Sequence, residues 1–441
     1  MAKNEVNLCE GSVLRGVAKV AVPTFLLSMV QLSYSIADQI MAGRFAGAEA
    51  LAAVGSVGGV TSLLVSIAAG LSMGSGIVMG RAYGSGNEEK ISDVAHTSVV
   101  LSLLCGFIML FSGVAFMEPM LNVAKVPDDI RSLARIYLFI TYLAFPFSML
   151  YNFCAAVLRG VGDTKTPMYI GFVSGFLNVV LNFVFLIPLR MGVAGVSIAS
   201  AISTVFSAIW LLCLLIKTDA PYKIRFKKLK IKKEELVVIS QLGIPSGIQN
   251  TLHTIANFSV QVGINTFGAV VIAGCSAASN IDVLVWTFGS AVNTAATTFV
   301  SQNMGAGKNE RVNGGINKIL LITLLGGMFL SLLLCVFIKP LLSLYTTDPA
   351  VIQAGIIRNR TVGSIYFTCA LSDVIIGILR AKGHAYFPTV VSFIFTCCLR
   401  VLWMYTVFAY FKTLESIYAV YLVSWLCTIA VNMIFLKKHK T

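Results

Sequence analysis

Long apolar segments recur along the whole chain, and they constrain its fold more than any other feature. Each is long enough for an α-helix to cross a bilayer, which takes roughly 20 residues. The stretches between them are short and mostly polar. We predict transmembrane helices over residues 16–40, 50–78, 94–118, 132–158, 166–188, 193–216, 238–266, 271–302, 316–346, 352–380, 386–410 and 413–436. Twelve such helices make an all-α polytopic membrane protein.

The composition excludes the main alternatives to a helical membrane protein. Of the 441 residues, 57% are hydrophobic and only 12% are charged, whereas a soluble protein carries roughly 25% charged residues. A soluble multidomain enzyme and a disordered chain are therefore excluded. A transmembrane β-barrel is excluded as well, because its strands are alternating segments of about ten residues rather than long apolar runs.

Basic residues give the chain a net charge of +14, and they lie between the apolar segments. The densest block, residues 217–233, joins two membrane segments and has no interleaved arrangement of stacking aromatics, so we expect no nucleic-acid partner. The N-terminus, the C-terminus and the loops after even-numbered helices hold 23 Lys and Arg residues, against 9 in the other loops. Positive charge marks the cytoplasmic side. We therefore predict a multi-pass protein of the cell (plasma or inner) membrane with both termini and the linker 217–236 in the cytoplasm.

Cysteine and histidine show no spacing that would hold a metal ion. The ten cysteines include no C-x-x-C pair, and the four histidines are scattered. We interpret the cysteines as small packing residues and expect neither a disulfide framework nor a cofactor. The N-terminal residues are polar without the pattern of a cleavable signal, so the first apolar segment is expected to be a transmembrane helix.

The two halves of the chain repeat each other at a nearly constant offset of about 221 residues. An even number of helices in each half returns the chain to the same side of the membrane, so the halves are expected to share one orientation. We predict two pseudo-symmetric six-helix bundles, 1–216 and 237–441, joined by the basic linker. The pairs that match at this offset are Pro23 with Pro245, Gly84 with Gly305, Arg159 with Arg380, Gly162 with Gly383 and Pro167 with Pro388.

Asp38 lies inside the first apolar segment, where a charge costs at least a few kcal/mol. Gln31 and Tyr34 precede it at helical spacing and share its face. A carboxylate in that place favours a functional role over packing. We expect Gln31 and Tyr34 to contact a substrate beside it.

Two later segments supply further oxygen ligands. Asn178 and Asn182 share one face of the fifth predicted helix, and Ser200 lies in the sixth. With Asp38 they provide one carboxylate, two amides and a hydroxyl, which are hard oxygens suited to a proton or a sodium ion. The alternative is that the amides and the hydroxyl only join helices by hydrogen bonds.

The seventh predicted helix carries a polar stripe that cannot face lipid. We expect it to face an aqueous cavity or the other bundle, with Gln249, His253 and Asn257 as substrate contacts. For His253 the alternative is a histidine satisfied between helices. The stripe consists of Ser246, Asn250, His253, Asn257 and Gln261, with Gln249 alongside.

Two further acids, Asp282 and Asp373, and one arginine, Arg400, lie inside apolar segments. Asp373 and Arg400 are expected to pair within the second bundle, either as a structural ion pair or as a functional relay, and both are candidates for substrate binding. Asp282 is expected near the surface of that bundle.

These residues resemble the multidrug and toxic compound extrusion (MATE) family of secondary transporters, over nearly the whole chain. The resemblance rests on an ordered set of motifs and on their repeat copies in the second half. The motifs are Pro23, Tyr34-Ser-Ile-Ala-Asp38, Ala48-Glu-Ala-Leu-Ala-Ala-Val-Gly55, Gly84-Ser-Gly, Arg159-Gly-Val-Gly-Asp-Thr-Lys-Thr-Pro167, Asn178 to Asn182 and Gly192-Val-Ala-Gly195.

The resemblance implies an alternating-access antiporter that exports amphipathic, often cationic compounds in exchange for sodium ions or protons. It implies that Asp38, Asn178 and Ser200 match a cation site, and that the first helix bends near Pro23. The chain departs from the family at Asn182, where many members carry a second acid, and at His253, where another group does. No enzyme activity is expected, and we expect a monomer in the lipid bilayer.

Two other functions fit a polytopic chain. A flippase for lipid-linked precursors would need a cationic cavity, yet apart from Arg400 and His253 few candidate cavity positions are basic. A membrane-embedded prenyl or acyl transferase would need a D-D-x-x-D motif or a catalytic dyad. Asp128 and Asp129 are followed by Ile-Arg-Ser instead, so the motif is absent.

Overall fold

The computed structural model describes residues 4–124 and 126–439, and these form helices without any strand. The first half contains α1 (Val13–Met41), α2 (Ala48–Ser85), α3 (Glu88–Ala115), α4 (Met117–Val123), α5 (Asp128–Gly160), α6 (Lys165–Leu186) and α7 (Gly192–Lys217). The second half contains α8 (Lys233–Ile264), α9 (Ala269–Gly305), α10 (Asn309–Ser343), α11 (Pro349–Thr361), α12 (Phe367–Ala381), α13 (Tyr386–Ser392), α14 (Leu399–Trp403), α15 (Ala409–Phe411) and α16 (Leu414–Lys438).

Twelve helical segments of the described chain are long enough to cross a membrane. Eleven of them also contain an apolar stretch of 18 residues, long enough to cross a membrane, with α11 and α12 counted as one and α13 to α15 as another. The twelfth is α8, which has 32 residues and is distinguished by its polar stripe. The predicted all-α architecture with twelve transmembrane helices is thereby confirmed. Several helices, such as α2 and α9, extend past their predicted ends because polar turns continue the helix beyond the apolar stretch.

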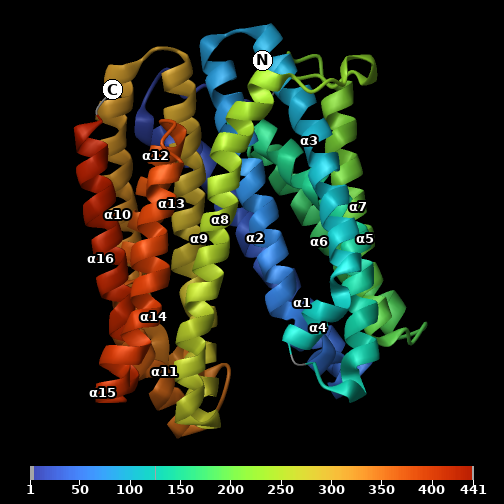
Figure 1. Cartoon of the computed structure of the whole chain (residues 1–441), viewed down its shortest axis with the longest axis vertical. Coiled ribbons are helices and arrows are strands. Elements are labelled where there is room, and N and C mark those ends of the chain that lie inside the picture. Colours follow the sequence, from blue (N-terminus) through green and yellow to red (C-terminus); the bar gives the residue numbers. More distant parts are fainter. Residues whose placement is uncertain (1–3, 125, 440–441) are drawn as a thin grey trace. The chain divides into compact units, whose positions relative to one another are not determined.

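The chain divides into two compact units (Figure 1). Unit 1 comprises the residues up to Asn7 and Leu26–Gly247, and unit 2 comprises Leu8–Phe25 and Ile248 onward. The first part of α1 thus belongs to unit 2, and the first part of α8 belongs to unit 1. Both changes of unit fall just after a proline inside the helix, Pro23 or Pro245. The bundle limits 1–216 and 237–441 stay a prediction.

Each unit is built around one central helix. In unit 1, α5 packs against α2, α3 and α7, and Tyr142, Met149 and Phe153 on α5 are fully buried. The first part of α8 joins this unit where Gly243 meets Leu71 of α2, too close for a Cβ atom. In unit 2, α9 packs against α10, α11 and α12.

The internal repeat is visible in the backbone. Three pairs of glycines, matched at the offset of the repeat, adopt positive φ angles in both halves: Gly47 and Gly268 (95° and 85°), Gly86 and Gly307 (both 70°), and Gly162 and Gly383 (84° and 100°). A side chain is strained in this region of φ. The pairs therefore end corresponding helices in the same way.

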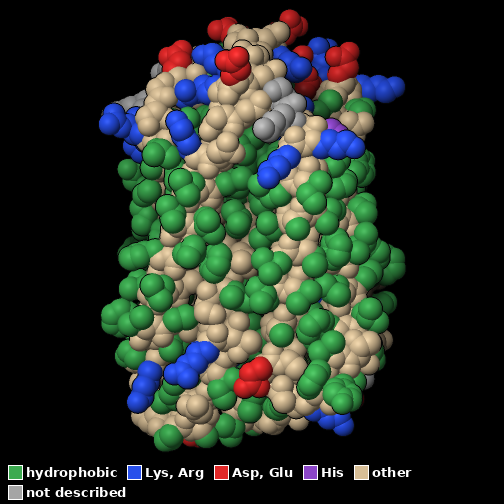
Figure 2. Space-filling view, turned by 90° about the vertical axis from the view of Figure 1, so that its left-hand side faces the viewer, with side chains coloured by type: hydrophobic (Ala, Val, Ile, Leu, Met, Phe, Trp, Pro, Cys, Tyr) green, Lys and Arg blue, Asp and Glu red, His purple; other side chains and the backbone are tan. Residues whose placement is uncertain are grey.

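Large apolar side chains cover the outward faces of the helices. On α10, Leu325, Phe329, Leu332 and Val336 are between 57% and 66% exposed. Figure 2 shows such hydrophobic side chains over the middle of one face, with charged side chains toward its two ends. This distribution suits contact with the hydrocarbon core of a bilayer.

The segment before α1 is docked on unit 2 by α9 and α10. The Leu8 backbone donates to Gln302 Oε1 (2.9 Å) and accepts from Asn303 Nδ2 (3.1 Å). The Arg311 guanidinium donates to the carbonyl oxygens of Leu8, Glu10 and Gly11, at 2.8 to 3.3 Å.

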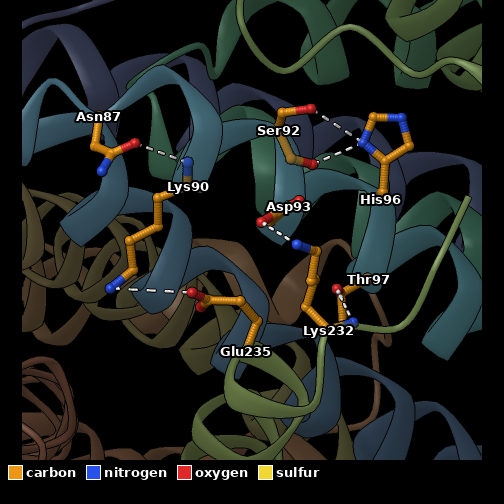
Figure 3. Close-up of polar contacts among 8 residues, drawn as sticks. All are labelled: Asn87, Lys90, Ser92, Asp93, His96, Thr97, Lys232 and Glu235. Carbon is orange, nitrogen blue, oxygen red and sulfur yellow. Dashed lines mark hydrogen bonds and ion pairs between the residues drawn. The ribbon is translucent and has the colours of Figure 1, made fainter. Parts of the chain in front are cut away.

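The segment before α8 is docked in the corresponding way on α3 of unit 1 (Figure 3). Lys232 donates its backbone N–H to Thr97 Oγ1 (3.2 Å) and pairs with Asp93 (3.3 Å), while Lys90 pairs with Glu235 (3.9 Å). Lys90 and Arg311 occupy equivalent positions of the repeat. The two lead-in segments are therefore held by equivalent helix ends.

Arg311→Ala is expected to destabilise unit 2. Three carbonyl oxygens lose a charged donor, and a hydrogen bond to a charged group is worth about 1.5–3 kcal/mol. Because Arg311 is half-buried, we expect the free energy of unfolding to fall by about 2 kcal/mol in total, less than the sum of three such hydrogen bonds. The thermal unfolding midpoint of the purified protein should fall, and Lys318→Ala on the exposed face of α10 should leave it unchanged. An equal midpoint for both variants would contradict this role of Arg311.

Candidate cation site

A face of small and polar residues on α6 brings α1 close. Gly171 faces Leu27 of α1 and Gly175 faces Tyr34, each at a distance that a Cβ atom would obstruct. Asn178 and Asn182 continue the same face of α6 at helical spacing, and both are buried. Because small residues let two helices approach, α1 reaches the amides of α6.

The four residues predicted as a cation site meet in a closed ring within unit 1. Asn182 Nδ2 donates to Asp38 Oδ1 (2.5 Å) and to Asn178 Oδ1 (3.3 Å). Ser200 Oγ, from α7, donates to Asp38 Oδ2 (3.4 Å) and accepts from Asn178 Nδ2 (3.3 Å). The structure thus brings all four side chains together.

One oxygen of this ring has no partner. The Asn182 Oδ1 atom is buried, and no group in the described part of the chain donates to it. A buried polar atom without a hydrogen bond costs about 1–3 kcal/mol. With the Asp38 carboxylate beside it, this oxygen fits the donor set of a sodium ion, which takes oxygen ligands as calcium does.

Two tyrosines lie near the ring. Tyr34 of α1 and Tyr137 of α5 are both close enough to Asp38 to interact with its charge. Tyr137 was not expected from the sequence, because no spacing along the chain relates it to Asp38. Gln31, predicted as a substrate contact, is exposed on α1; its role stays a prediction.

Side chains along the polar stripe of α8 accept hydrogen bonds from two buried arginines of unit 2, Arg380 and Arg400. Gln249, itself buried, accepts from Arg380 Nη2 (2.5 Å) and donates to Ser392 Oγ (2.7 Å). Asn257 accepts from Arg400 Nη1 (2.8 Å). His253 lies one helical turn from Gln249 and from Asn257. The positive charges of Arg380 and Arg400 act on its imidazole ring. The substrate contacts proposed for this stripe stay predictions.

Arg400 does not form the ion pair expected with Asp373. Its guanidinium donates to Asn257 and to Ser424 Oγ (3.2 Å) and lies 4.2 Å from the ring centre of Tyr421. An amide, a hydroxyl and an aromatic face thus satisfy it without a carboxylate. The charge of Arg380 acts on Asp373 instead.

A comparison with known families agrees with this architecture. The model of the MatE family matches residues 23–184 and again residues 245–406, which is well over half of the chain. The chain belongs to the MatE family. The two matches begin at Pro23 and at Pro245, the prolines that the repeat pairs, so the predicted repeat is confirmed for this MatE protein.

Individual relatives match over most of their length. The chain is 29% identical to the probable multidrug resistance protein YoeA of Bacillus subtilis over 391 residues, 86% of the chain and 84% of the relative. It is 25% identical to the probable multidrug resistance protein NorM of Thermotoga maritima, over 89% of the chain and 85% of the relative. A solved outward-facing MATE family transporter shares the fold, with a TM-score of 0.91 at 21% identity, over 99% of the chain and 98% of that structure.

Membership in the family decides the broad class of function. MatE proteins are membrane transporters of small molecules, so this chain is an integral membrane transporter and not an enzyme. The transferase alternative is therefore wrong.

The MatE chain also contains a buried ion pair that the sequence did not reveal. Asp282 of α9 pairs with Arg358 of α11, and Asn359 Nδ2 donates to the same carboxylate (3.3 Å). Asp282 is 1% exposed and Arg358 is 6% exposed, so the expectation that Asp282 lies near the surface is wrong. The signal that was overlooked is the Arg358-Asn359-Arg360 run, whose first two residues face inward while Arg360 is exposed.

Proposed function

We propose that this MatE transporter exports amphipathic, often cationic organic compounds in exchange for sodium ions or protons. The observation that carries the proposal is the ring of Asp38, Asn178, Asn182 and Ser200, with its unpartnered amide oxygen. The two relatives named above, both probable multidrug resistance proteins, support organic compounds as the substrate class.

The coupling follows from the charge of Asp38. A cation that binds the ring neutralises the carboxylate and changes its bonds to α6 and α7. A ligand shifts a conformational equilibrium only by its difference in affinity for the two states. If the ring is complete in one state and open in the other, cation binding favours the first, and substrate affinity changes with it.

The hinge is proposed at Pro23. A proline has no N–H to donate to the preceding turn, which weakens a helix locally. Pro23 is buried, and α1 runs on through it as one helix. The passage of α1 from unit 2 to unit 1 after Phe25 supports a bend at this place during transport.

Ion jumps across proteoliposomes test the proposed function. Vesicles containing the purified protein and a cationic dye should move the dye when a sodium or a proton gradient is imposed, against the direction of the ion flow. The ion whose gradient drives dye movement is the coupling ion. Equal dye movement with and without both gradients would contradict antiport, and lipid flipping without dye movement would favour the flippase.

We propose that both termini and the linker 217–236 face the cytoplasm, and that the protein works as a monomer in the cell membrane. The excess of basic residues on one side supports this orientation. A cysteine replacing exposed Lys228 should resist an impermeant thiol reagent in intact cells and react after lysis. The matched variant is Lys412→Cys, at an exposed position in a loop that is predicted to face the outside. This cysteine should react in intact cells. The reverse pattern would contradict the orientation.

A further inference from the structure

The linker between α7 and α8 is an ordered part of unit 1. Arg225 donates its backbone N–H to His96 Nε2 (3.0 Å), and His96 Nδ1 donates to the Ser92 carbonyl (2.7 Å). Lys232 donates its backbone N–H to Thr97 Oγ1 (3.2 Å). Figure 3 shows His96 and Thr97 on α3, whose side chains accept these two bonds from the linker backbone. Because the bonds to the linker use main-chain donors, they leave most side chains between Arg225 and Lys232 uncommitted.

Four basic side chains of this stretch have no ion-pair partner within residues 4–124 and 126–439, and all four are exposed. The neighbouring basic residues differ, since Lys223 pairs with Asp219 (3.2 Å) and Lys232 pairs with Asp93 (3.3 Å). The four unpaired residues are Arg225, Lys227, Lys228 and Lys230.

These four side chains and the two paired lysines line a cavity of ≈ 630 Å³ against the start of α3. Four acidic residues also line it. Asp93 and Asp219 are already paired, while Glu88 and Glu89 lie in the first turn of α3, where the helix dipole stabilises negative charge. The cavity therefore keeps an excess of positive charge on its linker side.

Apolar side chains alternate with the basic ones. Phe226 is 66% exposed and Ile231 is 39% exposed, although both are large and hydrophobic. The linker follows the end of α7 directly and leads directly into α8. A short segment held between two membrane helices stays close to the membrane surface, where a basic stretch with exposed apolar side chains is stabilised.

We propose that residues 225–232 bind the phosphate headgroup of an anionic phospholipid. Arg225 and the unpaired lysines contact the phosphate, and Phe226 and Ile231 enter the interfacial layer beside it. This binding is separate from the cation ring, and it does not depend on which ion drives transport.

The proposal is tested with the purified full-length protein in detergent and a phosphatidylglycerol that carries a fluorescent acyl chain. Phosphatidylcholine with the same label is the zwitterionic comparison, and glycerol 3-phosphate is the soluble competitor. The parent protein should bind phosphatidylglycerol more than tenfold more tightly than phosphatidylcholine, since each of several basic residues near an anionic surface adds about fivefold. This preference should shrink as salt rises from about 0.05 M to about 0.5 M.

The variant Arg225→Gln, Lys227→Gln, Lys228→Gln, Lys230→Gln should lose this preference and bind phosphatidylglycerol about as weakly as phosphatidylcholine. Its backbone bonds to His96 and Thr97 remain available, and its elution as a single species on size exclusion checks the fold. The matched control replaces one arginine and three lysines that are exposed in unit 2: Arg15, Lys318, Lys437 and Lys438. The control should bind as the parent does.

Three results would overturn the proposal. The first is unchanged phosphatidylglycerol binding by the linker variant, and the second is an equal loss in the control. The third is competition by glycerol 3-phosphate at the concentration of the lipid, which would mean that the cavity takes a soluble phosphate. Should the linker variant fail to fold, salt-independent binding by the parent protein would contradict the proposal by itself.

Discussion

Replacing Asp38 with asparagine is expected to abolish ion-driven export while leaving the protein folded. The amide keeps the size of the side chain and can still bond to Asn182 and Ser200, which hold the carboxylate now. An amide is also less costly to bury than a charge, so membrane abundance and the thermal midpoint should match the parent. Dye efflux should fall to background, because no cation can then favour one state over the other.

The control for this variant is Asp128→Asn, which removes an exposed carboxylate outside the ring. It should export dye at the parental rate. Drug resistance, membrane abundance and ion-driven dye efflux are measured together for both variants. If Asp38→Asn is poorly expressed or unstable, with normal coupling in the protein that remains, the ring has a structural role only.

Replacing Arg358 with methionine is expected to have the largest effect on stability. The change leaves the Asp282 carboxylate buried with Asn359 as its remaining polar contact. Removing one partner of a buried ion pair costs about 3–5 kcal/mol. The thermal unfolding midpoint of the purified protein should therefore fall strongly, and the yield from membranes should fall with it.

Two matched variants separate the ion pair from other causes. Arg360→Met, two positions away and exposed, should leave the midpoint unchanged. The double variant Asp282→Leu, Arg358→Met removes both charges and should recover much of the stability, because an apolar pair of similar volume is often as stable as a buried ion pair. A double variant as unstable as Arg358→Met alone would show that packing, rather than the unpaired charge, causes the loss.

The ring around Asp38 was predictable because each of its parts follows a rule along the chain. A carboxylate in an apolar segment is rare, and the i, i+4 spacing places Asn178 and Asn182 on one face. The sequence did not indicate which groups in the ring are hydrogen-bonded to each other. It also did not indicate that Tyr137 of α5 lies near Asp38. These depend on how four helices pack, and the pattern of one helix does not determine them.

The charged residues of unit 2 show the same limit. The apolar periodicity of α9 does not distinguish the face toward α11 from the face toward lipid, so Asp282 was placed near the surface. Arg358 lies in the predicted helix 352–380 but was not recognised as a partner for Asp282, because the polar run Arg358-Asn359-Arg360 interrupts the apolar pattern there. Arg400 was expected to pair with the one acid in a nearby span, but an amide, a hydroxyl and aromatic rings satisfy it.

The repeat was the most reliable guide to the fold. Its prolines and glycines fix backbone conformation, and for this reason the positive φ angles recur at the predicted offset. We did not predict that the first part of α1 belongs to unit 2 and the first part of α8 to unit 1. This assignment depends on tertiary contacts such as those of Leu8 with Arg311 and Gln302. Local sequence propensities do not indicate such contacts.

Binding of the coupling cation to the purified protein, with and without a saturating cationic dye, tests the central claim most directly. Linkage requires that dye and cation change each other's affinity by the same factor. We predict that saturating dye weakens cation binding severalfold in the parent protein, and that Asp38→Asn binds dye but shows no such effect. An undiminished effect of dye on cation binding in Asp38→Asn would contradict the role of the ring as the coupling site.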